Sequence, residues 1–312
     1  MAGILASRRS TAASLAKVCG FQAGCWVTVV TPRTFPPFTF FKSADPIATV
    51  IALGGSTNAV LHLLAIAHAA GWQWRIPLQH RSGNGHVFCS EFMSEDEARD
   101  ILLATVEGEP IAEPRTLRFK TGMRRKAWNG NVVALGLSSG FLEPLESTSI
   151  HLIQNGIAKL ISHFPDRGFA QANVDAYNRR IAYDYERIRD FIILHYHANQ
   201  RPEPFWQRCR EMSIPGTLRE KIELFRATGR VFREQEELFV EVGWFQVLTG
   251  QNVVPETYHP LADALSREEL AQFLRDIRSI VSSNAARLPS HADFIAATCA
   301  AQPVAMPAGA PV

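Results

Sequence analysis

The spacing of apolar residues changes from a period of two to a period near 3.6 along this chain, and that change constrains its fold. After Gly71 every second position is apolar, namely Trp72, Trp74, Ile76 and Leu78. The alternation predicts a strand with an aromatic face. Residues 82–85 (Ser-Gly-Asn-Gly) predict a turn, and residues 86–92 predict the return strand of a hairpin. Further strands are expected at 115–120 and 131–137.

Helical spacing dominates the rest of the sequence. Ser94 and Glu97 form a capping-box pattern, which predicts a helix ending near Val106. Two longer segments carry apolar residues on one helix face: Ile150, Ile153, Ile157, Leu160 and Phe164 in the first, and Val174, Tyr177, Ile181, Tyr185 and Ile188 in the second. Shorter helices are expected at 51–71, 217–227, 234–248 and 267–283. The pattern predicts an α+β protein in which a mixed sheet is followed by a mostly helical layer.

Charge is distributed unevenly along the 312 residues. The chain is formally +2, yet residues 1–44 hold no acidic residue and five basic ones, Arg8, Arg9, Lys17, Arg33 and Lys42. This composition favours a poorly ordered leader over 1–43, and a mitochondrial transit peptide has the same composition. The remainder lacks the global basic field of a nucleic-acid-binding protein.

Other functional classes are excluded by simpler features. No run of apolar residues approaches the roughly 18 needed to cross a bilayer, so we expect a cytoplasmic protein without a membrane partner. The five cysteines include no C-x-x-C pair, which argues against a zinc or iron–sulfur site. His195 and His197 could bind a metal together, but their place at a helix end favours a surface pair.

The segment 131–150 concentrates the residues that could carry chemistry. A helix beginning at 147–150 would present free amides and the positive end of its dipole to an anion. Two carboxylates, Glu143 and Glu146, bracket Pro144 just before that helix. An ordinary strand-to-helix connection explains the helix start, but it rarely needs both carboxylates.

A rival interpretation rests on residues 136–140, which match the G-x-S-x-G pattern of serine hydrolases with Ser138 as nucleophile. That pattern requires a helix directly after the serine, because the helix amides build the oxyanion hole. Pro144 and the two carboxylates intervene here, which makes the hydrolase the weaker hypothesis.

Several ordered motifs resemble the flavin-dependent tryptophan halogenase family. They are GWQWRIP (71–77), FMSEDEA (92–98), RRKAW (124–128), NVVALGLSSGFLEPLESTSIHLIQNGI (131–157), RPEPFW (201–206) and PETYHPLAD (255–263). The resemblance covers residues 71–300. It implies the remnant of a flavin-monooxygenase-like module followed by a helical substrate layer. Residues 44–71, with GGSTN, are similar to dihydroxy-acid dehydratase, so a chimeric or truncated product with a disordered tail at 301–312 is expected.

The resemblance also implies a role for individual residues: a catalytic carboxylate, contacts to FAD and halide, and the wall of a tunnel between flavin and substrate. The matching positions are Glu146 for the carboxylate, Leu137 and Ile150 for FAD, Thr148 and Ser149 for the halide, and Trp72 and Trp74 for the tunnel. For Trp74, simple core packing is an equally good explanation.

The implied chemistry needs reduced FAD from a separate flavin reductase, O₂, chloride or bromide, and a small aromatic substrate such as tryptophan. The sequence contains neither the G-x-G-x-x-G turn that cradles FAD nor the motif of the family's delivery lysine. Ser149 also stands where the best-known tryptophan enzymes have glycine. We therefore expect an incomplete halogenase; the alternative is a non-catalytic remnant that folds or dimerises.

Overall fold

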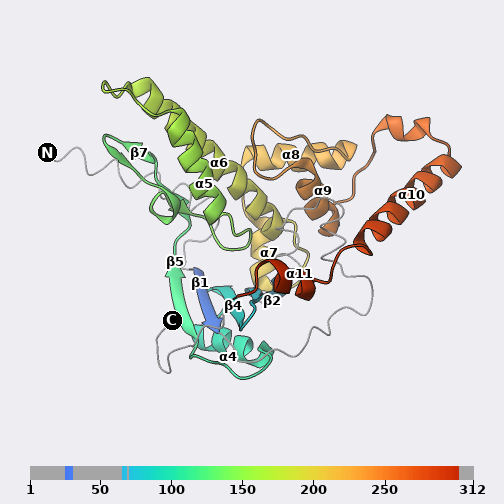
Figure 1. Ribbon diagram of the computed structural model, residues 1–312, viewed down its shortest axis with the longest axis horizontal. Helices are drawn as coiled ribbons and strands as arrows, with labels where there is room; N and C mark the ends of the chain where they lie inside the picture. The colour runs from blue at the N-terminus through green and yellow to red at the C-terminus, as the bar shows by residue number, and fades with distance from the viewer. Residues whose placement is uncertain (1–24, 31–64, 69, 302–312) are drawn as a thin grey trace.

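The computed structural model describes residues 25–30, 65–68 and 70–301, in which strands and helices are mixed as expected (Figure 1). The main sheet has the strand order β2-β3-β4-β1-β5, and every neighbouring pair is antiparallel. Its strands are β1 (Cys25–Val30), β2 (Ala65–His68), β3 (Gly71–Pro77), β4 (Ser82–Cys89) and β5 (Arg115–Phe119). The strands predicted after Gly71 and at 115–120 are confirmed.

β3 and β4 form the predicted hairpin, but its turn lies earlier than the sequence suggested. The Leu78 amide donates to the carbonyl of Arg81 at 2.8 Å and closes the turn. Residues 82–85 pair within β4 instead, so the turn predicted there is wrong. Glycine at position 85 leaves room for a side chain of the neighbouring strand. A Cβ at Gly85 would lie 2.3 Å from the ring of Trp74, its pairing partner on β3.

Two strands lie in segments for which the sequence predicted something else. β1 falls within residues 1–43, which were expected to be poorly ordered, and it pairs with both β4 and β5. β2 pairs with β3, so the helix predicted over 51–71 is wrong at Ala65–His68. Pairing with neighbouring strands, rather than local propensity, decides these short segments. The rest of both segments and the tail at 302–312 lie outside the described residues.

Helix α4 (Glu95–Thr105) packs on the sheet against β1 and β4 (Figure 1). Its predicted capping box is confirmed: Ser94 Oγ accepts from the Glu97 amide at 3.2 Å, and the Glu97 carboxylate accepts from the Ser94 amide at 2.8 Å. Ala98 and Leu102 are buried on its inner face. The helix therefore covers the sheet with the face that carries Ala98 and Leu102.

A stretch of short elements links the sheet to the helical layer. It contains β6 (Gly122–Met123), β7 (Trp128–Asn129), β8 (Val132–Val133), the 3₁₀ helix η2 (Gly136–Ser138) and β9 (Gly140–Phe141). The strand predicted over 131–137 is therefore wrong beyond Val133. Gly136 has φ +58°, a backbone conformation that favours glycine and ends extended structure here.

The helical layer is built around α6 (Gln171–His197), which is buried along much of its length. Packed near it are α5 (Ser149–Ser162), α7 (Pro204–Glu211), α8 (Gly216–Thr228) and α9 (Glu241–Gly250). The chain continues through η3 (Pro260–Ala264), α10 (Arg267–Ala285) and α11 (His291–Thr298). Two of these α-helices, α7 and α11, were not predicted, nor was the 3₁₀ helix η3, and α9 begins later than the expected 234. None of the described helices is both long enough and apolar enough to span a membrane.

Candidate functional site

Glu146 lies in the loop between β9 and α5, and its side chain is fully buried. The loop bends sharply directly after it, because Ser147 has φ +50°, an uncommon value for a residue other than glycine. Glu146 Oε1 lies 3.2 Å from Nε2 of His195, near the end of α6. The carboxylate therefore points from the loop toward the helical layer.

His195 is part of this site, contrary to the surface pair expected from the sequence. Its side chain is only 11% exposed, and its Nδ1 lies 2.8 Å from the carbonyl oxygen of Phe191. His197 is partly buried, with Nδ1 3.3 Å from the Cys209 carbonyl oxygen, and burial lowers its pKa. A signal for His195 was available: it follows buried Phe191 by four residues, which places both on one helix face.

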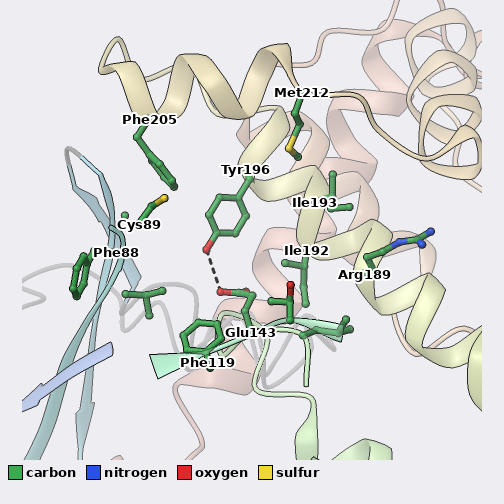
Figure 2. Close-up of a pocket in the computed structure, with 14 residues that line it drawn as sticks. Phe88, Cys89, Phe119, Glu143, Arg189, Ile192, Ile193, Tyr196, Phe205 and Met212 are labelled. Carbon is green, nitrogen blue, oxygen red and sulfur yellow. Dashed lines mark hydrogen bonds between the residues drawn. The ribbon is translucent and has the colours of Figure 1, made fainter. Parts of the chain in front are cut away.

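The second carboxylate of the loop, Glu143, meets the next residue of α6. Tyr196 donates its hydroxyl hydrogen to Glu143 Oε2 at 3.0 Å, as Figure 2 shows, and the Leu145 amide donates to Oε1 at 3.0 Å. Burial raises the pKa of Glu143 to about 8; the Tyr196 and Leu145 bonds act against that rise, and the charge of Glu146 adds to it. Glu143 thus holds a proton at neutral pH, although the residue as a whole keeps some exposure.

Trp72 ties the sheet to this network. Its indole Nε1 donates to the Tyr196 hydroxyl at 2.8 Å, so hydrogen bonds run from Trp72 through Tyr196 to Glu143. Trp72 is 5% exposed. Trp74 packs against the core and over Gly85, which agrees with the core-packing explanation for that residue.

A small apolar cavity of about 60 Å³ adjoins Glu143 and Tyr196 (Figure 2). Its walls come from the sheet and the helical layer, and include Phe88, Cys89, Phe205 and Met212. Burial raises the pKa of the Cys89 thiol, so it is protonated like Glu143. The arrangement keeps a neutral carboxylic acid beside apolar walls.

The start of α5 is the helix N-terminus at which the sequence predicted an anion site. Thr148 is the N-cap residue and is buried, and its side chain makes no capping hydrogen bond. Ser149 is the first helical residue, and the first turn of α5 holds no acidic side chain. The positive end of the helix dipole therefore meets no neutralising carboxylate within that turn.

Leu137 and Ile150 lie on the outside of the same region, and each is 71% exposed. η2, which carries Leu137, packs closely on α5: a Cβ at Gly136 would lie 2.9 Å from the Ile153 side chain. The structure thus separates the predicted residues into two groups. Glu146 faces inward to α6, whereas Leu137 and Ile150 are exposed apolar side chains.

Ser138 lacks the setting of a hydrolase nucleophile. Its hydroxyl donates to the Leu135 carbonyl at 2.7 Å and accepts from the Leu135 amide at 3.1 Å. The residues that follow it form β9 instead of a helix. The strand–turn–helix context that the G-x-S-x-G pattern requires is therefore missing here.

Comparison with known proteins agrees with the motifs. The sequence profile of the tryptophan halogenase family matches residues 47–267. The chain belongs to the tryptophan halogenase family. A second profile, that of the N-terminal part of dihydroxy-acid and 6-phosphogluconate dehydratases, matches residues 8–84. A dihydroxy-acid dehydratase of Albidiferax ferrireducens is 77% identical to this halogenase-family chain over 32 residues.

Individual relatives cover most of this halogenase-family chain but only part of their own length. A tryptophan 7-halogenase of Kutzneria sp. (strain 744) is 33% identical over 63% of the chain and 40% of the relative. The solved flavin-dependent halogenases of Xanthomonas campestris and Brevundimonas sp. BAL3 are 42% and 40% identical, each with a TM-score of 0.76, and cover 88% of the chain. The chain spans 52% of either structure.

Proposed function

We propose that the loop between β9 and α5 belongs to the active site of a flavin-dependent halogenase acting on a small electron-rich aromatic substrate such as tryptophan. One observation carries the proposal: Glu146 of this loop is buried against His195, whereas Leu137 of η2 and Ile150 of α5, in the elements that flank the loop region, are exposed. In this proposal the sheet and hairpin are the remnant of a flavin module, and the helices around α6 form the substrate layer.

The exposed apolar residues of η2 and α5 suit the flat apolar ring of FAD. Leu137 and Ile150 would contact that ring, because both apolar side chains are largely exposed. Reduced FAD with O₂ would supply the oxidising power for the halide. The packing of η2 on α5 holds this surface in place, since the two elements meet closely at Gly136.

The start of α5 would hold chloride or bromide beside that surface. Backbone amides near Thr148 and Ser149 would donate to the anion, and the helix dipole would stabilise its charge. A halide site of this type needs no nearby cation. The Thr148 hydroxyl, which caps no amide of α5, is a further donor in this proposal.

Glu146 would act as the catalytic carboxylate that orients or stabilises the halogenated substrate on the inner side of the loop. Its buried carboxylate is held at the helical layer, where the substrate would bind. Trp72 and Trp74 would line the passage between the two sides. Trp72 is the better supported of the two, because its indole is bonded into the network that reaches Glu143.

The partners follow from the same proposal. A separate flavin reductase would supply reduced FAD, and the cytoplasm is the expected location, with no nucleic-acid or membrane partner.

We also propose that residues 44–71 are a dehydratase-like segment joined to a halogenase C-terminal part at 71–300, behind a leader at 1–43. The second candidate function is a non-catalytic remnant that folds or forms a homodimer without chemistry; the short dehydratase match favours it.

Two measurements test the proposal. The chain as it stands should not retain FAD, because the sequence lacks the pyrophosphate cradle; co-purification of stoichiometric flavin would contradict this. A second protein would join the chain to the FAD module and delivery lysine of a relative. With a flavin reductase, O₂ and chloride, this protein should chlorinate tryptophan or another electron-rich aromatic compound, as measured by mass spectrometry.

Glu146→Gln in the rebuilt protein should lower turnover by roughly a hundredfold, the scale for removing one positioned acid–base or electrostatic group. FAD binding should not change. The matched control is Glu223→Gln, which alters an exposed glutamate of α8. Full turnover of Glu146→Gln would remove Glu146 from the mechanism, and loss of FAD binding would make its role structural. No chlorination by the rebuilt wild-type protein would favour the non-catalytic remnant.

A further inference from the structure

The tautomer of His195 is set by the backbone of α6. Its Nδ1 lies 2.8 Å from the Phe191 carbonyl oxygen, which can only accept a hydrogen bond. Nδ1 must therefore carry a proton. In a neutral imidazole the other ring nitrogen, Nε2, is then an acceptor.

That acceptor would face another acceptor. Nε2 lies 3.2 Å from Glu146 Oε1, and an ionised carboxylate oxygen also only accepts. Two lone pairs at this distance in a buried site repel each other, so the pair must hold a proton between them. An imidazole nitrogen is a stronger base than a carboxylate oxygen. The proton therefore resides on the nitrogen.

We propose that His195 is the positioning residue of Glu146: it is doubly protonated, and its Nε2–H holds the Glu146 carboxylate as an anion against α6. The bond to Phe191 fixes the imidazole ring, and the ring in turn fixes the carboxylate. Only the effect of His195 on turnover depends on the proposed function; its contact with Glu146 does not. Its test uses the present chain and needs no flavin.

The surrounding groups support a division of charge between the two carboxylates of the loop. Glu143 faces the pair from the same loop and holds its own proton, with Tyr196 of α6 bonded to it. Cys89 of β4 and Arg189 of α6 line the adjoining cavity. Two carboxylates placed three residues apart thus have different neighbours, and environments that separate the protonation of neighbouring carboxylates are typical of acid–base sites.

The proposal also explains why adjacent residues of α6 contact different carboxylates. His195 supplies a positive charge to Glu146, whereas Tyr196 supplies a neutral hydroxyl to Glu143. A cationic donor favours the ionised form of its partner. A neutral hydroxyl in a buried place does not offset the cost of desolvation at Glu143, whose pKa stays raised.

The test is ¹⁵N NMR of the histidine ring nitrogens in the labelled 312-residue chain at pH 7. The His195 signals are assigned by their loss in His195→Gln. We expect both ring nitrogens of His195 to be protonated in the wild-type chain. In Glu146→Gln, whose amide can donate to Nε2, we expect loss of the Nε2 proton while Nδ1 keeps its proton.

Glu143→Gln is the matched control, because it replaces a neutral acid of the same loop by a neutral amide; His195 should stay doubly protonated. A wild-type spectrum in which Nε2 carries no proton would overturn the proposal, as would an Nε2 proton that persists in Glu146→Gln. If Glu146→Gln does not fold, the wild-type spectrum alone decides. Failure of this test would leave the chlorination experiment unaffected, so the two ideas can be separated.

Discussion

Replacing Glu143 with glutamine should make the protein more stable at alkaline pH. Burial raises the pKa of Glu143 from 4.5 to about 8, so in the folded protein it keeps a proton that the unfolded chain releases. The unfolded state then binds fewer protons than the folded state between these two values. The free energy of unfolding must therefore fall as pH rises through this window, and the loss is complete above pH 8.

The size of the effect follows from the same numbers. Each pKa unit corresponds to about 1.4 kcal/mol, so the interval from pH 5 to pH 8 sets an upper limit of about 4 kcal/mol. We expect about half of this, roughly 2 kcal/mol, because the residue keeps some exposure to solvent. Glutamine cannot ionise, and its amide oxygen can still accept from Tyr196 or Leu145.

The assay is urea denaturation of the wild-type chain and Glu143→Gln at several pH values from 5 to 9. The two proteins should be similarly stable at pH 5, and Glu143→Gln should exceed the wild type by about 2 kcal/mol at pH 8.5. Other buried acids with raised pKa values, such as Asp184 and Glu237, occur in both proteins and cancel in the difference. Glu223→Gln should give a constant difference from wild type. A constant difference for Glu143→Gln as well would refute the reasoning.

Three further predictions concern stability and are checked by urea denaturation at pH 7. Lys159 and Asp184 form a buried ion pair, so Lys159→Met should cost about 3 kcal/mol by leaving a buried charge without its partner; a loss below 1 kcal/mol would contradict this. A Cβ at Gly71 would lie 1.8 Å from the Val87 carbonyl oxygen, so Gly71→Ala should destabilise the sheet by at least about 3 kcal/mol or prevent folding. Ser94→Ala should cost about 1 kcal/mol through loss of the capping box.

Many of the helices could be predicted because their signals are local. The capping box at Ser94 begins α4 as expected, and α10 begins at Arg267, where the sequence placed a helix. The apolar face of 174–192 lies within α6, which extends to His197. α7 was missed because eight residues hold too few turns to reveal a helical period, although Pro204 at its first turn is a helix-start signal.

The sheet was harder to predict because its strands depend on distant partners. β1 pairs with strands that follow it by more than 50 residues, and no pattern within residues 1–43 records those partners. β2 has the helix-like composition of its surroundings, yet it forms an edge strand of the sheet and pairs with β3. The turn at 82–85 was misplaced for a related reason. Its glycines look like turn residues, but in the structure they lie in β4, where a Cβ at Gly85 would clash with the ring of Trp74.

The candidate site shows the same division between local and distant information. The sequence places Glu143 and Glu146 in one loop, but it gives no means of telling them apart. Their difference arises because consecutive residues of α6, a histidine and a tyrosine, meet them from about fifty residues away in the chain. A cationic partner favours the ionised form of a buried carboxylate, whereas burial beside a neutral hydroxyl leaves the protonated form favoured. The protonation of the two carboxylates therefore depends on the last turn of α6 as much as on the loop itself. Variants at His195 and Tyr196 should change the protonation of Glu146 and Glu143 separately, and more cleanly than variants of the loop.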